Sequence, residues 1–330
     1  MKYNKANSIY ILLFLLISTG SCAQNKENNL IVGEFRITKV IDGDTFRFEG
    51  LDNSTRLLGI DTEETFKSND AEQKSNEIAL NWENYYLNEK GESRFPVKSD
   101  SPFGFETKKW TEEFFKDINT ARLEIEDTSR TIDIYGRYLV YLFAVKDGKE
   151  INYNVECVRQ GYSPYFNKYG NSKRFHKEFT DAQEYARINN LGIWDPAGKH
   201  YPDYEERIQW WNKRAGQIER YGTEFSGNEN YFNLSEDYDF SRLENFIGKE
   251  ITVFGSISDV LTKKFPYILR IPHDKEKVFE IIVFEENQDI LKELDLEELK
   301  NYYVYISGTL EKYKDRYQIN LKDKSQIRME

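Results

Sequence analysis

The chain has 330 residues, of which 39% are hydrophobic and 31% charged, and its formal net charge is −11. This composition excludes a disordered tail protein and a polytopic membrane protein, and it leaves room for two domains of ordinary size. The acidic balance also excludes a broad basic surface that would wrap nucleic acid without regard to sequence. Any phosphate binding must therefore be local.

The N-terminus has the pattern of an export signal. Two lysines precede an apolar run from Ile9 to Ile17, which is far shorter than the roughly 20 residues needed to cross a bilayer. Small residues then lead to Cys22, and this stretch resembles a bacterial lipoprotein processing site. We expect residues 1–22 to be a lipoprotein-type signal peptide whose Cys22 becomes the lipidated first residue.

This signal predicts an exported protein of the bacterial cell envelope, held at the membrane by a lipid anchor. Residues 23–32 would then be a tether between the anchor and the first domain. The alternative is simple secretion, with cleavage after Ala23.

Residues 33–200 predict a small barrel with interleaved helices. Short runs of β-branched and aromatic residues are separated by turn residues, and five such runs suit a closed sheet. The expected strands are Phe35 to Val40, Thr45 to Phe48, Thr55 to Ile60, Arg122 to Glu126 and Tyr138 to Val145. The expected helices are Ala71 to Asn88, a segment around Trp110, Asn152 to Gln160 and Arg174 to Asn190.

Residues 201–240 predict a helix followed by an acidic linker. The helix, Pro202 to Arg220, would place Ile208, Trp211, Ala215 and Ile218 on one face, and Gly222 to Asp239 is acidic and rich in turn residues.

Residues 241–330 then alternate as three strands, a helix and two strands, which is the order of an OB-fold. The predicted fold class is thus mainly β with α, or α+β: an N-terminal five-stranded OB-type barrel with helices, and a second, OB-fold-like barrel at the C-terminus.

Several catalytic mechanisms are excluded because their motifs are missing. The three histidines are isolated, and the chain has no H-E-x-x-H motif, no phosphate-binding P-loop and no G-x-S-x-G elbow. Cys157 lies in an apolar stretch and is expected to be a buried thiol. Carboxylates and arginines remain, and these residues suit a hard cation and an anionic substrate.

Three short motifs contain these charged residues. Each alone is typical of an ordinary turn or strand end, but their order and the strands around them are distinctive. The motifs are Asp42-Gly43-Asp44-Thr45, Arg56 followed by Asp61-Thr62-Glu63-Glu64, and Asp133-Ile134-Tyr135-Gly136-Arg137.

Together, these motifs make the chain resemble the staphylococcal-type thermonuclease family over about half its length, from roughly Gly33 to Trp194. Agreement extends to Phe103-Gly104-Phe105-Glu106, Val158-Arg159-Gln160-Gly161 and Leu191-Gly192-Ile193-Trp194. The resemblance implies a nuclease that cleaves DNA, RNA or both, with Ca²⁺ as cofactor.

The resemblance also implies roles for individual residues. Asp44 and Asp61 would supply carboxylates to Ca²⁺, and Thr62 would supply its backbone carbonyl, with Asp42 in a supporting position. The catalytic residues would be Arg56, Glu64 and Arg137. Oxygen ligands suit Ca²⁺, and two planar guanidinium groups suit a phosphodiester whose negative charge grows during the reaction.

The chain departs from the family pattern at several positions. Glu63 replaces a proline, which is expected to add negative charge beside the ion, and Ile134 replaces a lysine before Tyr135, the implied phosphate contact. Tyr165 and Tyr169 are candidates for the aromatic pair that contacts the base. The segment from Thr65 to Ser101 is longer than in the family and is either a lid or a surface insertion.

The loops of the predicted C-terminal barrel combine basic and aromatic residues. OB-folds bind oligonucleotides with these loops, so nucleic-acid binding by this barrel is one interpretation, and simple packing against the nuclease domain is the other. The candidate substrate-binding residues are Lys263, Lys264, Lys314 and Arg316.

The function predicted from the sequence is an exported, Ca²⁺-dependent nuclease, with DNA or RNA as substrate and with no obligate protein partner. The alternative is an envelope lipoprotein whose two barrels bind nucleic acid or a protein without cutting.

Overall fold

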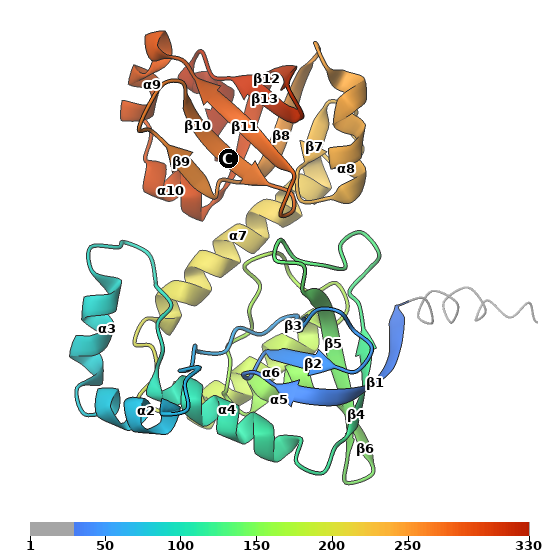
Figure 1. The fold of residues 1–330 in the computed structure, drawn as a ribbon, viewed down its shortest axis with the longest axis vertical. Coiled ribbons are helices and arrows are strands. Elements are labelled where there is room, and N and C mark those ends of the chain that lie inside the picture. Colours follow the sequence, from blue (N-terminus) through green and yellow to red (C-terminus); the bar gives the residue numbers. More distant parts are fainter. Residues whose placement is uncertain (1–29, 330) are drawn as a thin grey trace, which may run out of the picture.

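The computed structural model describes residues 30–329. The predicted signal peptide, Cys22 and most of the predicted tether lie outside this range. Two β-barrels are stacked along the long axis of the molecule, and a long helix, α7 (Tyr204–Glu224), runs between them (Figure 1). The predicted fold class is confirmed: the chain is α+β, with an N-terminal closed barrel and a second sheet-rich region.

The first barrel closes through a parallel strand pair. Its sheet has the order β3-β2-β1-β4-β5, and β3 pairs in parallel with β5, which completes the ring. β1 bends between the two halves, because its first residues pair with β4 and its last residues pair with β2. The strands are β1 (Ile31–Val40), β2 (Thr45–Phe48), β3 (Thr55–Leu57), β4 (Thr120–Glu124) and β5 (Tyr138–Lys146), with β6 (Lys149–Asn152) forming a hairpin on β5.

Three helices pack on this barrel: α4 (Pro102–Phe114), α5 (Tyr153–Arg159) and α6 (His176–Ile188). Their apolar residues Phe114, Cys157 and Phe179 join the buried core of the strands, and Cys157 is a free, buried thiol. The hydroxyl of Ser101 caps α4 by accepting a hydrogen bond from the amide of Gly104.

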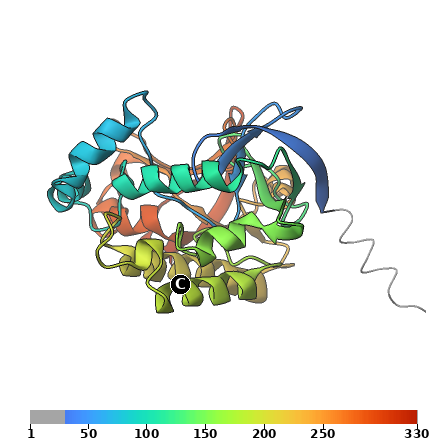
Figure 2. The same cartoon turned by 90° about the horizontal axis from the view of Figure 1, so that it is seen from below.

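The segment expected to contain one helix contains two, α2 (Ala71–Ala79) and α3 (Trp82–Lys90), which lie together on the side of the domain away from β1 (Figure 2). The helix breaks at Asn81 because the chain must turn there to bury Trp82 and Tyr86, whose rings pack on Tyr201.

The second barrel repeats the strand order of the first. Its strands follow the path β8-β12-β13-β11-β10-β9, and β11 pairs in parallel with β13. Only two residues separate β8 from β9, so they act as one bent strand that pairs with β12 at one end and β10 at the other. The strands are β8 (Glu250–Ser256), β9 (Asp259–Leu261), β10 (Tyr267–Pro272), β11 (Val278–Val283), β12 (Tyr303–Tyr313) and β13 (Arg316–Asn320), and β14 (Ile327–Arg328) pairs with β12.

The predicted helix of this barrel is also split in two, into α9 (Asp289–Lys292) and α10 (Leu296–Asn301). Asp295 separates them, because its side chain accepts a hydrogen bond from the amide of Glu298 and so starts a new helix.

The predicted linker is wrong at its C-terminal end. Residues 231–233 form strand β7 (Tyr231–Asn233), which pairs in parallel with β8, and α8 (Asp237–Arg242) follows. Phe232 and Leu234 are fully buried in the second core. These two apolar residues lie among acidic and turn-forming residues, so the sequence pattern does not indicate a strand there. The second domain therefore begins about ten residues earlier than expected.

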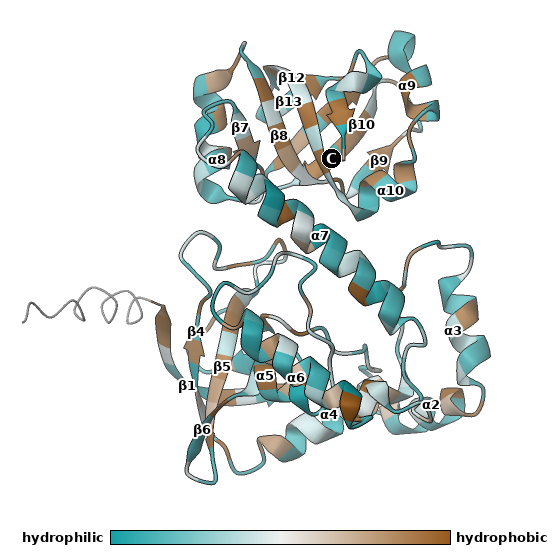
Figure 3. Cartoon of the chain, turned by 180° about the vertical axis from the view of Figure 1, so that it is seen from behind, coloured by the Kyte–Doolittle hydropathy of each residue, from teal (hydrophilic) through white to brown (hydrophobic). Residues whose placement is uncertain are grey.

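α7 connects the two barrels through a buried face that mixes aromatic and polar residues, and its hydropathy is mixed along its length (Figure 3). Of the predicted apolar face, Trp211 and Ala215 are buried, and Ile208 and Ile218 are half-buried. The polar residues Arg207, Arg214 and Gln217 are buried as well. The guanidinium of Arg214, only 2% exposed, donates to the carbonyl of Lys168 in the first domain (3.1 Å) and to that of Asn301 in the second (2.7 Å). Within residues 30–329, none of the helices has the length and apolar character needed to span a membrane.

Candidate active site

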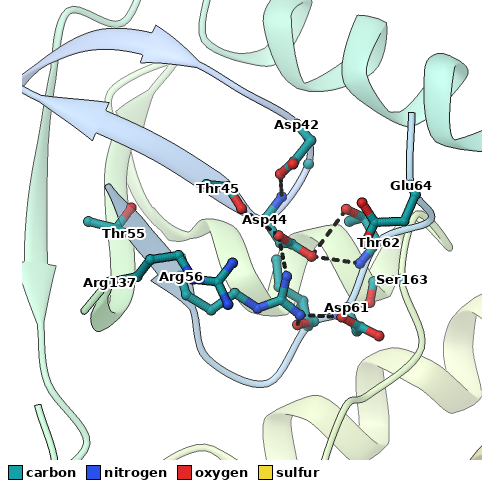
Figure 4. A network of polar contacts seen from close by, with 12 residues as sticks. Asp42, Asp44, Thr45, Thr55, Arg56, Asp61, Thr62, Glu64, Arg137 and Ser163 are labelled. Atoms are coloured by element: carbon teal, nitrogen blue, oxygen red, sulfur yellow. Dashed lines mark hydrogen bonds and ion pairs between the residues drawn. The ribbon is translucent and has the colours of Figure 1, made fainter. Parts of the chain in front are cut away.

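Three segments of the first barrel converge on one buried charged cluster (Figure 4). Asp42 and Asp44 lie in the turn before β2, Arg56 lies on β3, and Asp61 follows β3. The antiparallel pairing of β2 with β3 places Thr45 opposite Arg56, so the turn and the arginine are adjacent. The structure therefore brings together residues that are up to 19 positions apart in the first two motifs.

Asp44 is held by the residues on both sides of the cluster. One carboxylate oxygen accepts a hydrogen bond from the Thr45 hydroxyl (2.9 Å), and the other accepts from the amide of Thr62 (2.9 Å). Asp42 supports the turn, because its side chain accepts a hydrogen bond from the amide of Asp44 (3.1 Å). Burial and the charge of Asp44 raise the pKa of Asp42 to about 7, so Asp42 is partly protonated at neutral pH.

Arg56 joins the two principal carboxylates. One guanidinium nitrogen pairs with Asp44 and another pairs with Asp61, and the side chain also donates to the carbonyl of Ile60 (3.3 Å). Burial alone would lower the pKa of Arg56, but the two carboxylates outweigh it and raise the pKa. The ring of Phe166, which the sequence did not single out, lies 5.8 Å from the guanidinium carbon.

Asp61 has a second cationic partner that sequence reasoning missed. The ammonium of Lys98, from the inserted segment, lies 2.6 Å from Asp61 and 3.7 Å from Glu64. Burial tends to raise the pKa of Asp61, but Lys98 and Arg56 lower it to about 2. The amide of Asp61 donates to the hydroxyl of Ser163 (2.8 Å), which was also missed.

Glu63 points away from the cluster, so the expectation that it adds negative charge beside the ion is wrong. Its buried carboxyl accepts hydrogen bonds from the Ser101 hydroxyl, the amide of Tyr201 (2.6 Å) and the Tyr204 hydroxyl (2.7 Å). Burial raises its pKa. Successive residues of an extended chain face opposite sides, so turning Glu63 inward turns Glu64 toward Lys98.

The backbone of Glu64 is fixed by its neighbours. Its carbonyl accepts a hydrogen bond from the amide of Ser101 (3.0 Å), and helix α4 packs against it at Gly104. A Cβ on Gly104 would lie 2.0 Å from the Glu64 carbonyl oxygen, so only glycine fits at this position. This contact explains why the Phe-Gly-Phe-Glu motif at the start of α4 matters for the site.

Arg137 lies next to Arg56 (Figure 4). It directly precedes β5, whose parallel pairing with β3 puts Tyr138 opposite Thr55. Its guanidinium nitrogen Nε pairs with Asp133 at 2.7 Å, within the same turn. Tyr135, 65% exposed, has its ring centre 5.5 Å from the Arg137 guanidinium, so both side chains lie at the rim of the cluster.

The two candidate base-contacting tyrosines lie in different environments. Tyr165 is a core residue: its ring stacks on Phe179, its hydroxyl lies 3.1 Å from His176, and burial raises its pKa to about 12. This buried position does not favour a contact with the substrate. Tyr169 is 60% exposed and packs edge-on against Phe166, so it remains available to a ligand.

The four basic candidates of the second barrel lie away from the cluster. The C-terminal end of β10 is near the first domain, because Lys275, which follows it, lies 3.3 Å from where a Cβ on Gly136 would be. Lys263 and Lys264 precede the N-terminal end of β10, which is the opposite end of the strand. Lys314 follows β12, whose first residue, Tyr303, contacts Gln217 of α7. At about 3.3 Å per residue, the eleven residues from Tyr303 place Lys314 about 36 Å further along the chain.

Arg316, the fourth candidate, follows Lys314 closely and pairs with Glu280 at 2.6 Å. The structure therefore does not bring these four residues to the carboxylates. If they bind nucleic acid, they do so at a separate surface.

The residues available to a metal ion are few. Among residues 30–329, no three histidine, cysteine or acidic side chains come close enough to form a complete metal site. Asp44 and Asp61 are two converging carboxylates, and the Thr62 carbonyl is a third oxygen that follows Asp61 directly in the chain. An ion bound there would need water or substrate oxygens to complete its shell.

Comparison with known proteins gives an independent result. The family description "Staphylococcal nuclease homologue" matches residues 54–196. MJ1439, an uncharacterised protein of Methanocaldococcus jannaschii, is 30% identical over 162 residues, which are 48% of this chain and 70% of that protein. A thermonuclease of Staphylococcus intermedius is 27% identical over 193 residues, 58% of this chain and 93% of that enzyme.

Proposed function

The chain belongs to the staphylococcal nuclease homologue family, and we propose on this basis that it is a Ca²⁺-dependent nuclease. It would hydrolyse phosphodiester bonds of DNA or RNA. The observation that carries this proposal is the buried convergence of Asp44, Arg56 and Asp61 from three separate segments. Burying three charges costs folding stability, so such a cluster points to a function that outweighs this cost. Buried charged clusters of this kind are typical of active sites.

The two arginines would bind the substrate phosphate. A guanidinium offers planar, paired donors and does not lose its proton, so it suits phosphoryl oxygens that gain negative charge during the reaction. Arg56 now directs its donors to Asp44 and Asp61, and Arg137 directs its Nε to Asp133. A phosphate bound between the arginines would compete with these carboxylates for the same donors.

Glu64 would act as the general base. Its side chain is 37% exposed, so water can reach it, and its backbone is held by Ser101 and Gly104. A fixed carboxylate beside a bound phosphodiester can accept a proton from the attacking water.

Asp44, Asp61 and the Thr62 carbonyl would hold the Ca²⁺ ion. These groups fit a hard cation, because both carboxylates already converge on one cationic group, Arg56, and all their donor atoms are oxygens. The ion, when bound, would supply Lewis-acid polarisation of a phosphoryl oxygen. The export signal and the lipid anchor at Cys22 stay predictions within this proposal.

Cleavage of single-stranded DNA and RNA by the mature chain tests the proposal, with Ca²⁺ or a chelator, for the native chain and Arg56→Lys. We expect Ca²⁺-dependent cutting that falls about 100-fold or more in the variant, because lysine cannot bind two oxygens in one plane. Arg187→Lys, on α6 in an ion pair with Glu205 of α7, is the matched control and should cut normally.

Thermal unfolding of each variant confirms that the protein is folded. Intact substrate with a folded native chain that still shifts oligonucleotides on a gel would contradict the enzyme and favour the binding-module alternative. Equal cutting with Ca²⁺ and with chelator would contradict the metal dependence alone.

A further inference from the structure

The inserted segment places a lysine on the carboxylates of the candidate site. The Lys98 ammonium is 2.6 Å from Asp61 and 3.7 Å from Glu64, and the Asp61 side chain is only 4% exposed. Lys98 thus binds a carboxylate that the proposed function assigns to a metal ion. The Lys98 side chain itself is 44% exposed, so it has room to leave toward solvent.

Residues 94–101, which we name the strap, are attached to both domains. At one end, Arg94 pairs with Asp295 (2.5 Å) and Glu297 (2.6 Å) at the start of α10 in the second barrel. At the other end, the amide of Ser101 donates to the carbonyl of Glu64 beside the site. Only four positions separate Arg94 from Lys98.

The middle of the strap is also fixed, by residues around α7. The ring of Phe95 packs between Trp210 and Tyr302, at 5.5 and 5.9 Å between ring centres. The amide of Ser99 donates to the hydroxyl of Tyr201 (3.0 Å). Because the strap backbone is ordered on both sides of Lys98, placing its ammonium on Asp61 costs less conformational entropy than it would from a free loop.

We propose that Lys98 is a built-in competitor of the divalent cation at Asp61, and that the attachment of the strap to α10 sets how strongly it competes. This inference rests on the metal site of the proposed function. A divalent ion at Asp61 and the Lys98 ammonium repel each other at close range, so the ion must displace Lys98 to bind.

The attachment at Arg94 connects metal binding to the second barrel. A change that releases Arg94 from Asp295 and Glu297 removes one of the attachments that hold the strap. This loss weakens the hold of Lys98 on Asp61 and strengthens metal binding. By linkage, metal binding in turn loosens the strap on α10. The second barrel would then regulate the first without contributing a residue to the reaction.

Calorimetric titration of the mature chain with Ca²⁺, without substrate, tests this inference. Removing the competing charge in Lys98→Met should tighten Ca²⁺ binding about tenfold. Weakening the attachment at the far end of the strap in Glu297→Gln, which leaves the pair of Arg94 with Asp295, should tighten Ca²⁺ binding about twofold to threefold, although this residue lies outside the site. Lys109→Met, which removes an exposed pair with Glu72 on the same domain, is the control and should leave the affinity unchanged.

Unchanged or weaker Ca²⁺ binding in Lys98→Met would overturn the inference, as would a native chain and a variant that both bind no Ca²⁺. Lys98→Gln, which keeps a polar group at the strap, replaces the methionine variant if that protein does not fold. The titration measures binding alone, so a chain that binds Ca²⁺ as expected but cuts no nucleic acid would contradict the proposed function and leave the competition intact.

Discussion

The two barrels have the same strand order and opposite uses of charge. In each, a bent first strand joins the two halves, and the third strand pairs in parallel with the fifth: β3 with β5, and β11 with β13. Both third strands carry a charged residue in that pairing, Arg56 in the first barrel and Glu280 in the second. Their partners differ.

In the second barrel, Glu280 lies between two arginines, Arg270 (3.0 Å) and Arg316 (2.6 Å), and no further acidic side chain joins this set in the ion pairs of the described residues. In the first barrel, Arg56 faces two carboxylates, and Asp42 and Glu64 lie next to them. The cluster around Arg56 has more carboxylates than cationic side chains, and the cluster around Glu280 has more cationic side chains than carboxylates. In the proposed function, the same topology would support a site for a cation and a phosphate only where the turns supply carboxylates.

The largest expected effect is a loss of activity when the cluster around Arg56 is changed but not when the cluster around Glu280 is changed. Asp44→Asn removes a carboxylate that orients Arg56 and would hold the metal, so kcat on oligonucleotides should fall about 100- to 1,000-fold. Glu280→Gln changes the matching cluster of the second barrel and should leave kcat unchanged. A loss of similar size in both variants, with both proteins folded, would show that the second barrel takes part in the reaction.

A smaller effect concerns the junction between the barrels. Arg214→Met leaves the carbonyls of Lys168 and Asn301 with fewer donors in a buried place, and it should lower the free energy of unfolding by about 2 to 4 kcal/mol. Calorimetry should then resolve two unfolding transitions, one for each barrel. Lys177→Met, in an exposed pair on α6, is the control and should keep the native profile. A single unshifted transition in Arg214→Met would contradict the role of this residue at the junction.

The smallest effect is a pH dependence at Lys168, which lies over the ring of Trp210 at 4.0 Å. Burial, and then the charge of Arg214, lower the pKa of Lys168 to about 7 from an unfolded value of 10.5. Between pH 7 and pH 10.5, Lys168 therefore binds more protons in the unfolded chain than in the folded one. The free energy of unfolding increases as pH rises from about 7 to about 10.5 because of this difference.

Lys168→Met removes this pH dependence. The variant should be more stable than the native chain at pH 7 by about 1 to 2 kcal/mol, less than the full shift implies because the lysine is only half-buried. The difference should disappear near pH 10.5. Denaturant unfolding at pH 7, 9 and 10.5 measures it, with Lys177→Met as the control. A stability difference that is independent of pH would contradict the lowered pKa of Lys168 as its cause.

Local patterns in the sequence predicted much of the fold, and the resemblance to a known family indicated the residues at the centre of the candidate site. Strand Thr45 to Phe48 was predicted with its observed bounds, because alternating phenylalanines mark a half-buried strand. Asp44, Arg56 and Asp61 meet because they belong to adjacent strands and turns of one meander, whose pairing follows from short loops. The parallel closing of β3 on β5, which brings Arg137 beside them, agrees with the predicted five-stranded barrel, but the sequence did not predict this pairing.

Only the tertiary structure decided what surrounds this centre. Lys98 lies 37 positions from Asp61 in a polar segment without periodicity, so no local pattern could connect them. Glu63 and Tyr165 turn inward because distant groups, Tyr204 and Phe179, receive them there. Short-range periodicity encodes strands and turns, whereas the direction of a single side chain depends on long-range packing and hydrogen bonds, and these form only when the chain has folded.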